Sequence, residues 1–319
     1  MRFVYLAALL SCAAFAEQNV ERVLTCSHCS TAQDVAEVAT VLRSVLDIRE
    51  VSTDPDGKTV TLRAAQGQLE AAEWLVKQID RAPANPQISA DLSKLEYRLA
   101  ADDSVRVFFA PNAPGFQEFQ ESATVMRSIA EIRRVFTYNS PRAIVARGTD
   151  QQMTMAEWIH REFARAPNQT PAGQLQVGPD DNIRVFYLPN APTLQDFQEM
   201  ATVMRSTAEI RRLFTYSWPH AIVLRGTDEQ LRMADWMYHE FTRAPNAAAA
   251  GELHISGGET LRVFYLPNTP SVSAFQKEVV EVRKTTGIRR VFTVNRPRAV
   301  YVRDTPDKVS QAATLFATM

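Results

Sequence analysis

Two cysteines three residues apart are the most reactive side chains that the sequence brings together. They lie in the segment Thr25-Cys26-Ser27-His28-Cys29. A Cys-x-x-Cys pair at a helix start can form a disulfide, exchange thiols or bind a metal, because the exposed N–H groups of the helix stabilise a thiolate. A haem attachment site is excluded, since no histidine directly follows Cys29. Two possibilities stay open: a local disulfide, or a metal or redox site of Cys26, His28 and Cys29.

Arginine and tryptophan recur at a fixed interval. Arg134, Arg212 and Arg290 are evenly spaced, and the same interval separates Trp158 from Trp236. Exposed arginines commonly pair with neighbouring acids, and a tryptophan beside a buried stripe commonly completes the edge of a core. The alternative is that these five residues form a surface that docks a neighbouring module or a partner protein.

This interval arises from copies of one unit. The segment Arg184-Val-Phe-Tyr-Leu-Pro-Asn has counterparts beginning at Arg106 and Arg262. A fourth copy begins at Arg22, and placing Arg22 on Arg184 aligns it with the third copy without a gap. Repetition of this length indicates that each copy is one structural unit of a tandem array.

The third copy predicts the elements of every unit. Strand patterns cover residues 183–188, 212–216 and 221–225, where β-branched and aromatic residues are enriched. Helical periodicity follows Thr193 and Thr227, and Thr227 with Gln230 has the spacing of a capping box. We therefore predict an α+β fold of four tandem βαββα modules, each a small sheet with two helices on one face. Modules 2–4 have an additional alternating segment, which predicts an extra leading strand.

Module boundaries follow from the Pro-, Ala- and Gly-rich segments between copies. We predict a signal peptide at 1–16, module 1 at 17–83, and modules 2, 3 and 4 with their linkers at 84–167, 168–245 and 246–319.

The first residues are typical of an export signal. Arg2 is followed by an apolar run and then by Ala14-Phe15-Ala16, a cleavage pattern that makes Glu17 the first mature residue. Leu-Ser-Cys12 also resembles a lipobox, although Cys12 lies early for one, so a lipid anchor is the less favoured expectation. No other segment has the apolar length of a transmembrane helix. We expect a periplasmic or extracellular protein.

The segments YLPNAP, AIVLRGT and TDEQLRMA, in this order, resemble the N-terminal periplasmic modules of bacterial outer-membrane secretins. Those are small ring-building domains of secretion and type IV pilus systems. The resemblance covers the mature chain four times over, but the pore-forming barrel of secretins has no counterpart here. It implies a scaffold or adaptor of the cell envelope, with protein partners or self-association.

Other functions find less support. No phosphate loop, G-x-S-x-G or HExxH motif is present, so we expect neither an enzyme nor a bound cofactor. The net charge of −1 does not point to nucleic acid, because acids balance the arginines of each unit. The rival function is metal handling or thiol redox at Cys26 and Cys29, since a Thr-Cys-x-x-Cys loop before a helix also resembles that of heavy-metal-associated domains. Against it, the repeat register places the two cysteines on Leu188 and Ala191, which are ordinary turn positions.

Overall fold

The computed structural model describes most of the chain. The residues described are 19–81 without 55 and 57, 95–164 without 111, 173–243 without 219, and 251–318. The predicted signal peptide and Cys12 lie outside these ranges. The chain forms two compact units, Met1–Pro83 and Ala84–Met319, which are described separately.

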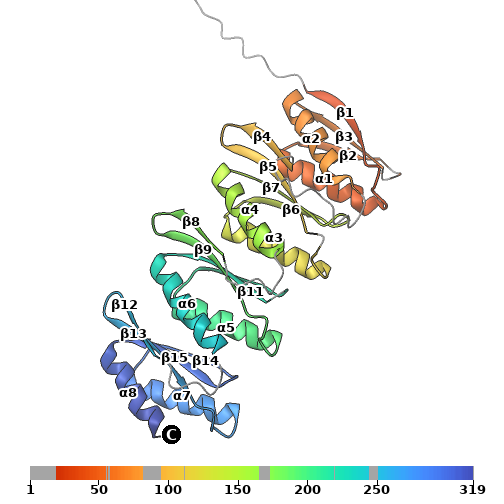
Figure 1. Cartoon of the computed structure of the whole chain (residues 1–319). Coiled ribbons are helices and arrows are strands. Elements are labelled where there is room, and N and C mark those ends of the chain that lie inside the picture. Colours follow the sequence, from red (N-terminus) through yellow and green to blue (C-terminus); the bar gives the residue numbers. More distant parts are fainter. Residues whose placement is uncertain are drawn as a thin grey trace, which may run out of the picture. The chain divides into compact units, whose positions relative to one another are not determined.

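The first unit is module 1, a three-stranded antiparallel sheet with two helices (Figure 1). The order of its strands is β1-β3-β2. Thr31 caps the first helix through a capping box with Asp34. The elements are β1 (Val20–Thr25), α1 (Ala32–Leu46), β2 (Glu50–Thr53), β3 (Thr59–Ala64) and α2 (Gln66–Ile79).

The second unit contains modules 2, 3 and 4, each with a four-stranded antiparallel sheet and two helices. Module 2 comprises β4 (Glu96–Ala100), β5 (Asp103–Phe109), α3 (Phe116–Ile129), β6 (Arg134–Tyr138), β7 (Ala143–Gly148) and α4 (Asp150–Ala164). Module 3 comprises β8 (Gln174–Gly178), β9 (Asp181–Tyr187), α5 (Leu194–Thr207), β10 (Arg212–Tyr216), β11 (Ala221–Gly226) and α6 (Asp228–Thr242). Module 4 comprises β12 (Glu252–Ile255), β13 (Glu259–Tyr265), α7 (Val272–Thr286), β14 (Arg290–Val294), β15 (Ala299–Asp304) and α8 (Pro306–Ala317).

The predicted α+β fold of four tandem modules is confirmed, and so is the extra leading strand of modules 2–4. The strand orders are β4-β5-β7-β6, β8-β9-β11-β10 and β12-β13-β15-β14, so β4, β8 and β12 each add a fourth strand beside the first strand of the basic unit. Thr227 and Gln230 form the expected capping box, in which each side chain accepts a backbone N–H of the other residue. Local sequence therefore fixes where α6 begins.

The sheets of modules 3 and 4 are buried on both faces. In β11, Ile222 and Leu224 point toward the helices of their own module, whereas Ala221 and Val223 belong to the apolar cluster of module 2. Tyr301 and Val263 of module 4 join the cluster of module 3 in the same way. Because each sheet lies between two helical layers, its strands have continuous apolar runs instead of simple alternation.

The outer sheet face of module 1 differs in chemistry. Ser52 and Arg63 are exposed there, and Thr61, the counterpart of Val223, is half-buried. The strand β3 alternates buried residues with more exposed ones, which is the pattern of a sheet with one apolar face. The four modules therefore share a fold but not an outer sheet surface.

The first prediction concerns this second buried face. Replacing Val223, which is fully buried, with Ala removes two buried carbons and leaves a cavity against module 2. We expect the free energy of unfolding to fall by about 2 kcal/mol, measured by urea denaturation. Thr61→Ala, at the matched position of module 1, should cost less than about 0.5 kcal/mol. Equal costs at both positions would contradict a buried role for the outer face.

Candidate functional site

The contact between successive modules of the second unit is the most elaborate polar arrangement among the described residues. Glu131 lies directly after α3 of module 2. One of its carboxylate oxygens is 2.5 Å from Nη2 of Arg212 on β10, and the other is 3.4 Å from Nη1 of Arg225 on β11. One acid of module 2 thus engages two strands of module 3.

Arg225 connects three groups at this contact. Its side chain is 9% exposed and donates to both carboxylate oxygens of Asp181, at 2.8 and 2.5 Å, and to the carbonyl of Ile129 at 3.1 Å. The hydrogen bond from Arg225 lowers the pKa of the Asp181 carboxyl, and the same bond raises the pKa of Arg225. Both groups therefore stay charged where the two modules meet.

Further contacts join the same two modules. At the middle of α3, Glu121 accepts the backbone N–H of Ser217 at 2.8 Å and its hydroxyl at 3.1 Å. Tyr187 donates its hydroxyl to the carbonyl of Glu162 at 2.8 Å. The apolar residues between these polar contacts supply most of the stabilisation, and the polar groups set the relative position of the modules.

Modules 3 and 4 repeat this contact at the equivalent positions of the next copy. Glu209 lies 3.0 Å from Arg290 and 3.5 Å from Arg303. Arg303 also donates to the carbonyl of Thr207 at 2.8 Å. Glu199 accepts the backbone N–H of Asn295 at 3.1 Å, as Glu121 accepts that of Ser217. Two interfaces are therefore built from one set of residue types.

The two bridging acids adopt an unusual backbone conformation. Glu131 and Glu209 have φ values of 55° and 53°, in the left-handed region that favours glycine. The equivalent residue of module 4 is Gly287, with φ of 64°. A non-glycine residue in this region costs about 1 kcal/mol or more. Asp47, the equivalent residue of module 1, has φ of 57°, so this conformation follows the first helix in each of the four modules.

The predicted surface residues take different places. Arg212 and Arg290 lie in the two interfaces, whereas Arg134 begins β6 opposite Arg147 within module 2. Trp158 and Trp236 are half-buried and pack against the apolar clusters of modules 2 and 3.

Trp158 also lies close to the segment that leads into module 3. A Cβ added to Gly173 would lie 3.0 Å from its Cζ2. Trp158 therefore lies at the core edge of module 2, close to the segment that leads into β8.

Sequence reasoning missed Glu131, Asp181 and Arg225, together with their counterparts Glu209, Glu259 and Arg303. The available signal was their fixed spacing, because acid and arginine both recur at the interval of the repeat. Spacing alone does not tell which acid pairs with which arginine, because Arg225 pairs both with Asp181 of its own module and with Glu131 of the preceding one.

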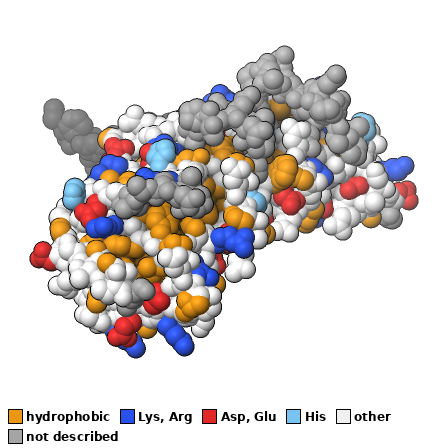
Figure 2. Space-filling model, turned by 60° about the horizontal axis from the view of Figure 1, so that its bottom comes forward, with side chains coloured by type: hydrophobic (Ala, Val, Ile, Leu, Met, Phe, Trp, Pro, Cys, Tyr) orange, Lys and Arg blue, Asp and Glu red, His pale blue; other side chains and the backbone are white. Residues whose placement is uncertain are grey.

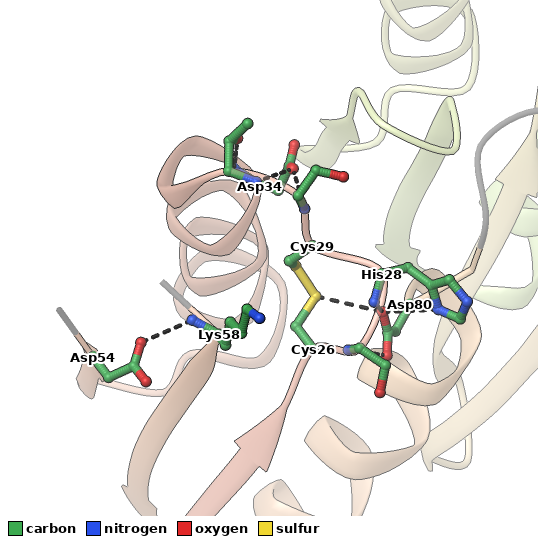
Figure 3. The surroundings of a disulfide bond; sticks show 10 residues. Cys26, His28, Cys29, Asp34, Asp54, Lys58 and Asp80 are labelled. Atoms are coloured by element: carbon green, nitrogen blue, oxygen red, sulfur yellow. Dashed lines mark hydrogen bonds and ion pairs between the residues drawn. A yellow bond between two sulfur atoms is a disulfide. The ribbon is translucent and has the colours of Figure 1, made fainter. Parts of the chain in front are cut away.

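The two cysteines of module 1 form a disulfide (Figure 3). Their Cα atoms are 5.4 Å apart, and the residues are 2% and 7% exposed. Asp80, after α2, accepts the backbone N–H groups of Ser27 and His28, both at 2.7 Å, and lies 3.4 Å from Nδ1 of His28. The loop is thereby tied to the end of α2.

This disulfide occupies the place of a proline-containing turn in the other modules. The N–H of Cys26 donates to the carbonyl of Lys58 at 2.9 Å, as the N–H of its counterpart Leu188 donates to that of His220 at 2.9 Å. Sγ of Cys26 lies 3.5 Å from the Asp80 carboxylate, which would repel a thiolate formed on reduction. No group of three or more metal-ligating side chains occurs in the described part of the chain.

Comparisons with known proteins add little. Neither a family model nor a curated protein matches the chain. Among solved structures, aspartate kinase from Synechocystis is similar at 12% sequence identity with a TM-score of 0.18. The match covers 94% of this chain, which spans 54% of that one. So low a TM-score carries no argument about fold or function.

The second prediction tests Arg225. Arg225→Gln removes the charge that holds Asp181 and weakens the bond to the Ile129 carbonyl, so we expect a loss of about 2 kcal/mol in unfolding free energy. Arg212→Gln, at a more exposed ion pair, should cost less than about 1 kcal/mol.

The comparison is made by urea denaturation at pH 7 and at low pH. The Asp181 contribution is present above its unfolded pKa of 3.8 and is lost as the pH falls through its lowered folded value. The difference between wild type and Arg225→Gln should therefore shrink in acid. A difference independent of pH would contradict the ion pair.

The third prediction concerns the disulfide. Because the closed loop is short, its removal in Cys26→Ser/Cys29→Ser should lower the stability of module 1 by about 2 kcal/mol. Denaturation with and without reductant measures this effect. The double variant should be insensitive to reductant, and modules 2–4 should unfold as before. An unchanged wild-type midpoint in reductant would show that the bond does not stabilise module 1.

Proposed function

We propose that this protein is an exported, non-enzymatic scaffold of tandem α+β modules, which holds protein partners together in a bacterial cell envelope. The observation that carries the proposal is the contact between successive modules, which occurs twice in modules 2–4 with acids and arginines at equivalent positions. Such an interface joins small modules, each marginal alone, into one extended body with several surfaces. The resemblance to secretin periplasmic modules supports a role in a secretion or pilus system, by analogy of fold pattern.

One feature of the structure supports the envelope as its location. The Cys26–Cys29 disulfide suits an oxidising compartment, in agreement with the export signal expected at 1–16. No helix in the described part of the chain combines the length and the apolar character needed to span a membrane.

The surface chemistry favours protein partners over nucleic acid. Basic and acidic side chains are interspersed on the face shown in Figure 2. Many of the arginines of the second unit pair with acids, as Arg106 does with Glu96 and Glu157. Paired charges leave little of the positive field that binds a phosphate backbone.

Metal handling or thiol redox at Cys26 and Cys29 is the second candidate. It rests on Asp80, whose carboxylate lies 3.5 Å from Sγ of Cys26 and 3.4 Å from Nδ1 of His28. Titration of the reduced protein with copper separates the candidates: tight 1:1 binding that is lost in Cys26→Ser would favour the metal function over the scaffold.

The fourth prediction tests the scaffold directly. A tagged chain, expressed in its native cells and mildly crosslinked, should be recovered from the envelope fraction with its N-terminus at Glu17 and with envelope assembly proteins attached. Mass spectrometry identifies both. An unrelated exported protein with the same tag is the control. Recovery of the chain alone, or from the cytoplasm with the segment 1–16 still attached, would contradict the proposal.

A further inference from the structure

The sheet of module 1 has an open edge along β1. In modules 2–4 the counterpart of β1 pairs with an additional strand, β4, β8 or β12. No strand within residues 19–81 or the other described ranges lies on the outer side of β1. Val20 and Val23 of β1 are 41% and 56% exposed. An exposed edge with apolar side chains is a template for another strand.

The opposite edge of the same sheet is obstructed. Arg43 of α1 donates Nη2 to the carbonyl of Val51 on β2 at 2.6 Å, and Arg205 contacts Leu213 of β10 in the same way at 2.5 Å. A side chain on an outward carbonyl competes with pairing by another chain. The two edges of the first sheet are therefore not equivalent, and β1 is the accessible one.

We propose that β1 binds an extended segment of a partner protein as an antiparallel fourth strand. The other modules show how such a strand is recognised. Arg106 of β5 holds two carboxylates, Glu96 of the added strand at 2.6 Å and Glu157 of α4 at 2.5 Å. Arg22, its counterpart on β1, already pairs with Glu73 of α2 and is 36% exposed. A partner acid opposite Arg22 would complete the same arrangement.

The neighbouring residues of β1 specify the rest of the segment. Glu21 stands where the other modules have an apolar residue, such as Leu261, so it favours a basic residue in the partner. Val23 and Val20 favour apolar residues on either side. The preferred segment therefore has the order apolar, acidic, basic, apolar. The preceding partner residue, opposite Leu24, would lie over a shallow hollow formed with Val76 and Lys77.

Backbone geometry supports the pairing. Val185, the counterpart of Val23, donates its N–H to the carbonyl of Gly173, on the approach to β8, at 3.4 Å. The N–H of Val23 therefore faces the open edge rather than β3. Replacing Val23 with proline removes this outward donor and leaves the hydrogen bonds between β1 and β3 in place, since proline is tolerated on edge strands.

The inference rests on the proposed scaffold function and names one of its binding surfaces. The probe is the fluorescein-labelled, amidated peptide Ser-Leu-Val-Glu-Lys-Val-Ser, added to the whole chain beginning at Glu17. Fluorescence anisotropy measures its affinity, and amide hydrogen exchange locates its site. We expect micromolar binding and new protection of the outward amides of β1.

Two variants test the register. Val23→Pro should weaken binding about tenfold or more, because a backbone hydrogen bond is lost and proline obstructs the edge. Glu21→Arg/Arg22→Glu should prefer a peptide with the order Val-Lys-Glu-Val over the original. A gain of affinity for the exchanged peptide cannot result from misfolding.

Three outcomes would overturn the inference. They are no binding of either peptide, binding that Val23→Pro and the charge exchange leave unchanged, and amides of β1 that are already protected in the free chain. If one of these outcomes occurs but crosslinking in cells still recovers envelope partners, only the partner strand on β1 is disproved. If the peptide binds but crosslinking recovers no partner, only the scaffold function is disproved.

Discussion

The burial of both sheet faces in modules 3 and 4 is the constraint on which the second unit depends. The outer face of the module 3 sheet carries Val185, Tyr187 and Val223, which belong to the apolar cluster of module 2. The outer face of the module 4 sheet carries Val263 and Tyr301, which belong to the cluster of module 3. Exposed to water, such a face would be a liability for aggregation. The preceding module's helices cover it. Stacking is therefore part of how modules 3 and 4 fold, and not an addition to finished domains.

Polar contacts at the rim of each interface decide how the modules stack. An apolar face alone would tolerate sliding and rotation, because hydrophobic contact has little direction. Glu131 and Arg225 in one interface, and Glu209 and Arg303 in the next, fix one position. The stacking of the modules and the proposed binding of a partner strand thus use different chemistry: side-chain pairs between modules, and an open backbone edge toward the partner.

Module 4 shows that this interface chemistry is specific. Where α3 and α5 bury Val125 and Val203 against the next sheet, α7 carries the exposed Glu281. Lys277 replaces the acid of Glu199, and Gly287 replaces that of Glu209. The helical face of module 4 therefore carries charged side chains at positions where modules 2 and 3 bury apolar ones or bind the next module. The same backbone supports either a docking face or a solvated one, according to a few side chains.

Much of the fold was determined by the sequence itself. The repeat, the capping residues such as Thr227 and the alternating segments before modules 2–4 are local features, so they predicted the elements and their order. A disulfide between Cys26 and Cys29 was one of the two possibilities that the sequence allowed, because so short a spacing always brings two cysteines near each other. Tertiary structure decided what local patterns cannot contain. It paired Glu131 with Arg225, far away in the chain, and buried Val223 against another module. It also left β1 without a fourth strand among the described residues. Such contacts depend on how whole modules pack, and the side-chain periodicity within one module does not predict them.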